Sequence, residues 1–446
     1  MSAAPLTDSD RRLLLRLLEL PTAGYLETGS GTAPPRLREA QDAYARAACD
    51  LGFTAVHHAA PDPAALDRPD TPLAVREAAA AHPGFLAAEP SLVLRLGPPR
   101  PREATAMFNV HLDTVAGWEP PRFDGARFHG RGSADAKGPA VALLAGVRAA
   151  LRGDPGIGTG SGIGVVVQAV AGEEGGAMGS FGTRPLIEHG FVGRLNLFCE
   201  PTSLRYLPRS TAAMTARIRA AGRDAVDDRP DRGHNATVLL GFLAQHLAHA
   251  LPERTGGAAP VCVAGLHTGT RHNRVYGSGD LLLNLPYADA RAAPRLGEAV
   301  ESALADGLAE FSARFADVPG FALTAAQAPQ ITRLEWLKRG LPTLHCTDPW
   351  LHRLLGEHAG LDRWPDDQPA FTCDAVWMDG VPGTCTAVLG PGDLAANNAH
   401  ADGEFADLAE LEDFAGAVAR VLTGFAREFR ATSAASAGTP KRQGQP

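Results

Sequence analysis

The sequence predicts an α/β protein with a mixed, mostly parallel sheet, interrupted by a smaller α+β insert. In the first part of the chain, apolar runs such as 165–167 and 195–199 alternate with helical segments, as strands and helices do in a parallel sheet. Across residues 211–323 the order becomes strand, helix, strand, strand, helix, which favours an antiparallel sheet with helices on one face. The first pattern then returns, with an apolar strand at 385–389 and a long amphipathic helix after it.

These changes of pattern set the domain boundaries that we predict. Residues 1–207 and 326–430 form the two parts of one α/β domain, and residues 208–325 form the insert. The last residues, 431–446, are low in sequence complexity, which predicts a disordered tail.

Composition and charge exclude several classes of protein. The chain has 446 residues, 45% of them hydrophobic, and a formal net charge of −8, so it offers no basic surface for nucleic acid. Its six cysteines form no CxxC pair, which favours a reducing compartment over a disulfide framework. No apolar run approaches the roughly 20 residues that span a bilayer, and the N-terminal segment is typical of an amphipathic helix rather than of a signal peptide. We therefore expect a cytoplasmic protein without a membrane or nucleic-acid partner.

The stretch FNVHLDTV, followed later by GRGSADAKG, carries the first candidate site. Apolar and polar residues alternate in the first piece, so His111 and Asp113 stand where a half-buried strand ends. Open α/β sheets bind ligands at this edge. In the second piece a glycine-rich turn places Asp135 directly before an apolar helix. Because zinc and similar ions accept imidazole and carboxylate ligands, these residues look like half of a metal site.

Other elements supply residues of the same kinds. Glu173 and Glu174 follow one apolar strand, Glu200 follows the next, and His400 lies in a loop near the end of the chain. Taken singly, an adjacent glutamate pair is most often a solvated turn, and a lone histidine in a loop is most often an exposed side chain. Together, residues that follow parallel strands would meet at one edge of the sheet, where carboxylates can converge without being buried unpaired.

The chain resembles the di-zinc amidohydrolases that include acetylornithine deacetylase, succinyl-diaminopimelate desuccinylase, aminoacylase and related carboxypeptidases. The matching segments are HLDTV, FDGARFHGRGSADAKG, AGEEGG, CEPTS and GPG…AHADGE, which cover the whole α/β domain in the family's order. The resemblance implies a zinc-peptidase-like catalytic domain, with the insert as a lid and dimerisation domain. It also implies a homodimer formed through the lid, with a small-molecule amide or peptide as substrate.

The resemblance further implies a role for each site residue. His111 and Glu200 would hold one zinc ion, Glu174 and His400 would hold the other, and Asp135 would bridge the two. Cobalt or manganese ions accept the same ligands.

Two further carboxylates would complete the catalytic machinery. Asp113 would hydrogen-bond to the other ring nitrogen of His111 and so fix its tautomer. Glu173 would act as the general base, which takes a proton from the attacking water and passes it to the leaving nitrogen.

The insert departs from the family at two positions. Val226 stands where relatives carry a histidine that stabilises the oxyanion, and Pro286 replaces an arginine that grips a substrate carboxylate. Asn273 matches an asparagine of the family's lid and would contact the substrate. The histidines that could stand in for the missing one are His234, His267 and His272, although each is more often an ordinary surface residue.

We expect a di-zinc amidohydrolase that cleaves an amide or peptide bond of an N-acyl amino acid or a peptide-like small molecule. The departures in the lid leave a second hypothesis open, in which the same metal site serves acyl transfer, condensation or a lyase-type step in specialised metabolism. A third hypothesis, a non-catalytic protein that keeps a metal for structure or binding, fits less well because the base Glu173 is present.

Overall fold

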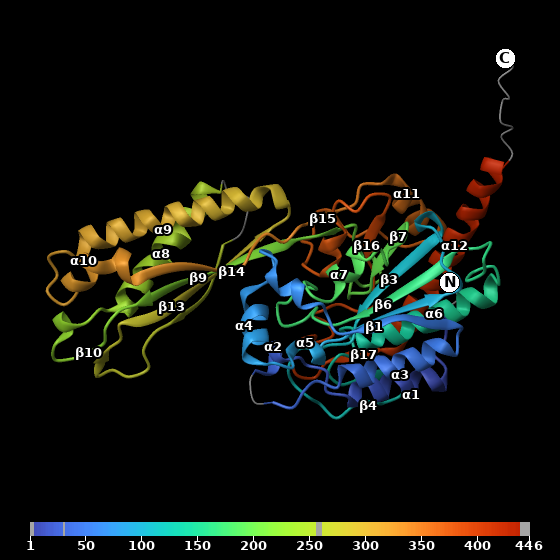
Figure 1. The fold of residues 1–446 in the computed structure, drawn as a ribbon, viewed down its shortest axis with the longest axis horizontal. Helices are drawn as coiled ribbons and strands as arrows, with labels where there is room; N and C mark the ends of the chain where they lie inside the picture. Colours follow the sequence, from blue (N-terminus) through green and yellow to red (C-terminus); the bar gives the residue numbers. More distant parts are fainter. Residues whose placement is uncertain (1–3, 30–31, 256–260, 438–446) are drawn as a thin grey trace, which may run out of the picture. The chain divides into compact units, whose positions relative to one another are not determined.

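The computed structural model describes residues 4–29, 32–255 and 261–437 (Figure 1). The chain divides into two compact units, of which one joins Met1–Ser210 to Leu344–Pro446 and the other consists of Thr211–Thr343. Each unit has its own sheet and its own helices. No helix in the described ranges is long and apolar enough to cross a bilayer.

The first unit is built on a six-stranded sheet. In spatial order its strands are β1 (Phe53–Ala59), β2 (Ser91–Leu96), β6 (Gly164–Val170), β3 (Thr105–His111), β7 (Leu195–Phe198) and β16 (Cys385–Val388). The last four of these strands are parallel to one another. The pairings of β1 with β2 and of β2 with β6 are antiparallel. The predicted α/β fold with a mostly parallel sheet is therefore confirmed.

Helices cover this sheet and bury its central strands. Every residue of β3 and of β6 is buried, as expected for parallel strands with helices on both faces. The helix α6 (Lys137–Gly153) packs against β3 and against the long helix α12 (Leu408–Ala437). The two helices approach closely at Gly146, where a Cβ atom would lie only 2.6 Å from the carbonyl oxygen of Ala415.

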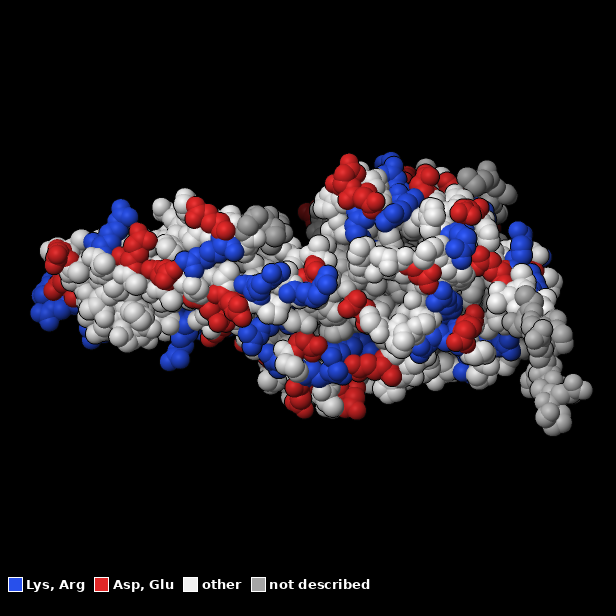
Figure 2. Space-filling model, turned by 90° about the horizontal axis from the view of Figure 1, so that it is seen from above, with Lys and Arg blue, Asp and Glu red and all other residues white. Residues whose placement is uncertain are grey.

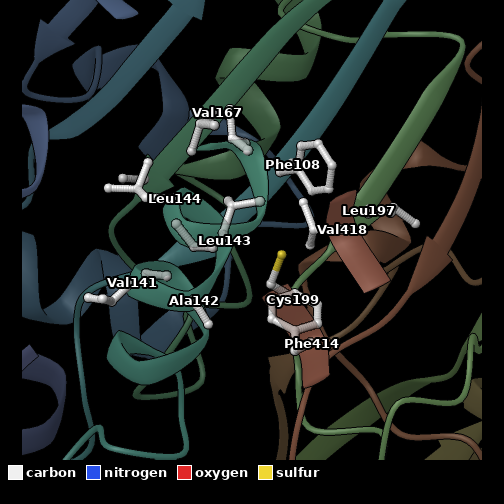
Figure 3. Packing of buried hydrophobic residues seen from close by; sticks show 14 of the residues in the cluster. Phe108, Val141, Ala142, Leu143, Leu144, Val167, Leu197, Cys199, Phe414 and Val418 are labelled. Carbon is white, nitrogen blue, oxygen red and sulfur yellow. The ribbon is translucent and has the colours of Figure 1, made fainter. Parts of the chain in front are cut away.

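The core of this unit lies between the sheet and these two helices. Figure 3 shows Phe108 of β3, Leu143 of α6 and Val418 of α12 in one apolar cluster, and all three side chains are fully buried. Burial of each such side chain contributes about 1.5–3 kcal/mol to folding. This packing gives the residues at the ends of the strands a rigid base.

Shorter elements complete the first unit. Its early helices are α1 (Asp8–Glu19), α2 (Tyr25–Thr28), α3 (Leu37–Cys49), η1 (Pro63–Asp67), α4 (Leu73–Ala81), α5 (Phe85–Ala88) and η2 (Arg102–Ala104). Its later ones are α7 (Thr183–Glu188), α11 (Pro349–His352), the π-helix η5 (Arg353–His358) and η6 (Asp374–Met378). A small sheet joins β17 (Phe405–Asp407), β5 (Arg127–His129) and β4 (Arg122–Phe123), and β8 (Arg209–Ser210) pairs with β15 (Leu344–His345).

The second unit is an antiparallel sheet with helices packed on it. Its strands, in spatial order, are β11 (Cys262–His267), β13 (Ser278–Tyr287), β9 (Ala212–Ala221) and β14 (Thr332–Lys338). The helices α8 (Ala236–Arg254), α9 (Ala293–Phe315) and α10 (Ala322–Ile331) contact one another, and α8 also contacts three of the strands. Short elements are β10 (Ala225–Val226), β12 (Arg274–Val275), η3 (Pro230–Arg232) and η4 (Ala290–Ala292).

The structure differs from the sequence-based expectations in three places. The edge strand β1 is not predicted, because its sequence FTAVHHA has two adjacent histidines where a strand pattern needs an apolar residue. The insert extends to Thr343 instead of ending at residue 325, because β14 pairs with β9. The predicted tail begins too early: α12 continues to Ala437, since the alanine-rich end of the helix favours helical structure, and residues 438–446 lie outside the described residues.

Candidate metal centre

Three parallel strands of the first unit end at the same edge of the sheet. β3 ends at His111, in register with Val170 at the end of β6. The chain continues from β6 to Glu173 and Glu174, and from β7 to Glu200. Because neighbouring parallel strands end together, their carboxyl ends bring these side chains to one place.

Asp135 lies at the centre of this cluster. Its Oδ1 is 2.9 Å from Nε2 of His111, and its Oδ2 is 3.1 Å from Nε2 of His400. The same nitrogen of His400 is 3.1 Å from Oε1 of Glu174, and Nε2 of His111 is 3.7 Å from Oε2 of Glu200. Each carboxylate oxygen of Asp135 faces a different histidine, as a carboxylate that bridges two metal ions does.

The donor atoms form groups of the size that a metal ion needs. In each group the ligand atoms all lie within 4.8 Å of one another, and the groups are His111 with Asp135 and Glu200, Asp135 with Glu174 and His400, and His111 with Glu173 and Glu174. The first two groups share Asp135 and contain the same residues as the two predicted ligand sets. Imidazole and carboxylate donors in this combination suit zinc and related divalent ions.

The orientation of His111 supports a cation at this place. Its Nδ1 lies 3.0 Å from the carbonyl oxygen of Asp113, an atom that can only accept, so Nδ1 carries the proton. Nε2 then presents its lone pair to the carboxylates of Asp135 and Glu200. Acceptors that face one another repel unless a cation or a second proton lies between them. The residues therefore fit a metal ion.

Asp113 makes a different contact from the predicted one. Its Oδ1 is 3.7 Å from Nδ1 of His111, which is too far for a hydrogen bond, so the backbone carbonyl orients His111 instead. The carboxylate is turned towards the end of β6, where Oδ2 accepts the backbone N–H of Glu174 at 3.1 Å. Asp113 therefore positions two of the predicted ligands, one through its backbone and one through its side chain.

Burial and mutual charge shift the pKa values of the cluster. Burial raises the pKa of Glu174 to about 7. Hydrogen bonds with Asp135 and Glu174 raise the pKa of His400 to about 10. The pKa of Glu173 lies well above its ordinary value, first because of burial and then because of the negative charge of Glu200. Buried carboxylates at this density are stabilised by a cation among them.

Glu404 holds the turn that carries Asp135, and sequence reasoning did not assign it a role. Its buried carboxylate accepts four hydrogen bonds. Oε1 accepts the backbone N–H groups of Ala134 at 2.9 Å and Asp135 at 3.2 Å, and Oε2 accepts the N–H of Gly132 at 3.0 Å and Nη1 of Arg131 at 2.8 Å. The only sequence signal was its place in the matching segment AHADGE.

The chain on either side of Asp135 is fixed as well. The peptide bond between Asp135 and Ala136 is cis. α6 begins at the next residue, Lys137, whose buried Nζ donates to the carbonyl of Leu20 at 3.0 Å. Burial lowers the pKa of Lys137 to about 7.

Asp374 is a second buried carboxyl group that sequence reasoning missed. Thr183 donates its hydroxyl to Oδ2 of Asp374, and Nδ2 of Asn109 donates to the same hydroxyl oxygen at 3.1 Å. Oδ1 of Asp374 has no hydrogen-bond partner among the described residues. Its negative charge is one of the causes that raise the pKa of Glu173. No apolar strand or glycine turn precedes Asp374 in the sequence, so no pattern marks it.

A comparison of the sequence with known protein families shows which family the chain belongs to. Residues 107–424 match the family described as Peptidase family M20/M25/M40. The chain belongs to this family. It is accordingly a metal-dependent hydrolase that acts on amide bonds. None of the curated proteins matches this M20 hydrolase significantly in sequence.

Solved structures with the same fold extend over almost the whole M20 chain. An aminopeptidase PepT from Bacillus cereus is 14% identical, with a TM-score of 0.62 over 95% of this chain and 100% of that one. A tripeptidase from Staphylococcus aureus is 14% identical, with a TM-score of 0.65 over 94% of this chain and 99% of that one. An M20 family metallo-carboxypeptidase from Sulfolobus solfataricus is 12% identical, with a TM-score of 0.64 over 95% and 99%. At these identities the likeness shows the fold.

The second unit holds the predicted lid residues of the M20 chain. Val226 lies in β10 and is 60% exposed. Asn273 is exposed just before β12. Pro286 is half-buried in β13, opposite Ala213 of β9. The structure places all three predicted positions, but their contacts with a substrate remain predictions.

One of the histidines that could replace the missing donor is already engaged. Nδ1 of the buried His234 accepts the backbone N–H of Arg223 at 2.8 Å, and Nε2 lies 2.9 Å from Oε1 of Gln327. Both ring nitrogens are used within the second unit, so His234 has no free donor. His267 and His272 are exposed.

Proposed function

We propose that this M20 hydrolase is a di-zinc amidohydrolase that cleaves N-acyl amino acids or small peptides. The observation that carries the proposal is the pair of donor groups that share Asp135, one completed by His111 and Glu200 and the other by Glu174 and His400. Two zinc ions held there would supply Lewis-acid activation of water and of the amide carbonyl. Cobalt or manganese would suit the same donors.

Glu173 is the residue that we propose as the general base. It is half-buried beside the shared cluster, and neither of the two groups that contain Asp135 needs it as a ligand. Its raised pKa favours a carboxyl group that can both take a proton from water and return it to the leaving nitrogen. The carboxylate of Asp113 accepts a hydrogen bond from the backbone N–H of Glu174 and so holds the segment that carries Glu173 and Glu174 in place.

The structural neighbours and the predicted lid residues support the proposed substrate class. The neighbours include a tripeptidase and a carboxypeptidase, which favour a short peptide or a similar amide. We propose Asn273 as a substrate contact in the lid. Val226 and Pro286 stand where the family resemblance implies a hydrogen-bond donor and a cation, so we expect the substrate to differ from a plain N-acyl amino acid with a free carboxylate.

The same two positions favour one alternative function. An exposed valine in place of an oxyanion donor weakens hydrolysis, and the metal centre would then serve acyl transfer, condensation or a lyase-type step. In that case no water-derived product forms from a simple amide.

We also propose that the chain pairs with a second copy through the second unit. Val263 and Leu266 are exposed on β11, which ends the order of strands in its sheet. An edge strand with exposed apolar side chains is a common place for strand pairing between copies. Sedimentation of the native chain and of Leu266→Lys tests the proposal, since the variant should shift the chain towards a monomer.

A substrate panel tests the proposed reaction. Zinc-loaded protein is offered N-acyl amino acids and dipeptides, and the release of free amine is followed. Amine release that falls by about 10²–10⁴ in Glu173→Gln, but not in the exposed control Glu357→Gln, supports hydrolysis with Glu173 as base. Release that is unchanged in Glu173→Gln contradicts that role. A protein that binds its metals and releases no amine favours the alternative reaction.

A further inference from the structure

The first unit contains a hollow that none of the proposed chemistry uses. It has a volume of about 390 Å³ and lies against α6 and α12. Four arginines line it, Arg148 and Arg152 from α6 and Arg420 and Arg427 from α12, together with His358 of η5. Among the described residues, no aspartate or glutamate lines it. On the face shown in Figure 2, basic and acidic side chains are interspersed.

Two of these guanidinium groups have no counter-charge in the described structure. Arg152 and Arg427 are exposed, and neither makes an ion pair or a hydrogen bond with a described residue. Arg420 uses only Nε, which donates to the carbonyl of Ala359 at 2.7 Å. Its terminal nitrogens remain available as donors.

The other two basic groups are held in place by carboxylates outside the lining. Arg148 donates from Nη1 to Oδ1 of Asp10 at 2.9 Å. Nδ1 of His358 lies 3.3 Å from Oε1 of Glu428. These two carboxylates face Arg148 and His358, and the negative charge of Asp413 acts on Arg420. Arg152 and Arg427 have no such carboxylate among the described residues, which leaves an excess of positive charge around the hollow.

Small residues keep the hollow open. Ala145 and Ala149 of α6 and Gly416, Ala419 and Gly424 of α12 form much of its wall. None of them has a side chain long enough to fill the space or to reach a guanidinium group. The volume falls within the range of about 300–1,000 Å³ that is usual for small-molecule sites.

We propose that this arginine-lined hollow binds a small phosphorylated anion. A guanidinium group matches the oxygens of a phosphate with two parallel N–H donors, and it is more weakly hydrated than an ammonium group. Arg152, Arg420 and Arg427 line the same hollow from two helices, and all three have donors without a partner among the described residues. Carboxylates share part of this chemistry, so phosphate and carboxylate ligands are compared directly in the test.

The test uses the full, zinc-loaded chain and isothermal titration calorimetry at fixed ionic strength. The probes are glucose 6-phosphate, glucose and succinate. The variants are Arg152→Gln, Arg427→Gln and the two combined, because both arginines are exposed and support no other described residue. The matched control is Arg46→Gln, another exposed helical arginine without a described partner, which does not line the hollow. An unchanged thermal unfolding midpoint shows that each variant is folded.

The proposal predicts saturable binding of glucose 6-phosphate and none of glucose. Each substitution in the hollow should weaken binding about tenfold, as the loss of a charge-assisted hydrogen bond does, and Arg46→Gln should not. Equal binding by the native chain and the double variant overturns the proposal, because the anion then binds elsewhere, for example among the metal ligands. Succinate binding as tight as that of glucose 6-phosphate, with the same losses, overturns the preference for phosphate.

Discussion

The carboxylate of Glu404 accepts the backbone N–H of Asp135 at 3.2 Å, although the two residues are far apart in the sequence. It accepts three further hydrogen bonds from the same turn and is almost fully buried. The residue proposed to bridge two metal ions is therefore held by another carboxylate that touches neither of the predicted ligand histidines. Support of this kind commonly governs the affinity of a metal site.

Glu404→Gln should weaken metal binding. The amide has the same size, but its NH₂ group would face N–H donors of the turn and could not accept from them. We expect zinc affinity to fall by about 10–100-fold, measured by competition with a chelating dye. Asp402→Asn, an exposed carboxylate in the same loop, is the control and should leave the affinity unchanged. Native affinity in Glu404→Gln would show that the turn keeps its shape without this carboxylate.

Asp374→Asn should change the pH profile of the reaction. Burial raises the pKa of Asp374 itself, but where Asp374 is ionised its negative charge helps to raise the pKa of Glu173, so its removal lowers the pKa of Glu173. A general base must be deprotonated to act, and the acid limb of kcat/KM should therefore move to lower pH. Asp367→Asn, which is exposed, is the control. An acid limb that stays in place in Asp374→Asn would mean that Asp374 carries no charge in the working enzyme.

Val226→His should increase amide hydrolysis. The side chain at this position is 60% exposed, so the substitution is not expected to disturb the fold. If the histidine donates to the oxyanion as it is expected to do in relatives, kcat should rise by up to about 10² on a cleavable amide. Val226→Ala provides the control for simple loss of valine. The absence of any gain on the whole panel would indicate that the missing donor does not limit the reaction.

Asp10→Asn should destabilise the protein in a pH-dependent way. Burial alone would raise the pKa of Asp10, but hydrogen bonds from Arg148 and Thr7 outweigh it and lower the pKa. A lowered pKa in the folded state contributes stability above the unfolded value of about 3.9, and that stability is lost as the pH falls through the folded value. We expect a loss of about 1–3 kcal/mol at pH 7 in urea unfolding, shrinking below about pH 4.

The control for this prediction is on the same helix. Asp8 is highly exposed and lies 3.9 Å from Arg11, so Asp8→Asn should change stability by less than about 1 kcal/mol. A loss in Asp10→Asn that stays the same from neutral to acidic pH would indicate lost packing or capping rather than lost charge.

The sequence predicted the sheet and the residues that follow its strands, and physical reasons explain this success. Apolar strands such as β3 and β6 are buried on both faces, so their composition is distinctive, and parallel strands end at one edge. His111 and Glu200 could therefore be placed without a structure. The two groups that share Asp135 emerged in the structure with the predicted members.

Other features could not be predicted because they depend on contacts between distant segments. The carboxylate of Glu404 accepts hydrogen bonds from a turn near residue 132, and the carboxylate of Asp374 accepts one from the hydroxyl of Thr183. Neither relationship leaves a local pattern. The hydrogen bond to His111 was assigned to the wrong atom of Asp113, because side-chain direction at the end of a strand is decided by the neighbouring strand.

Metal stoichiometry tests most directly whether Asp135 serves two ions in one metal centre. Elemental analysis of purified zinc-loaded protein is compared with that of His400→Ala and Asp135→Asn. We expect about two zinc ions per native chain, about one in His400→Ala, and little tightly bound zinc in Asp135→Asn. Native protein that binds a single ion, or Asp135→Asn that keeps both, would contradict this expectation.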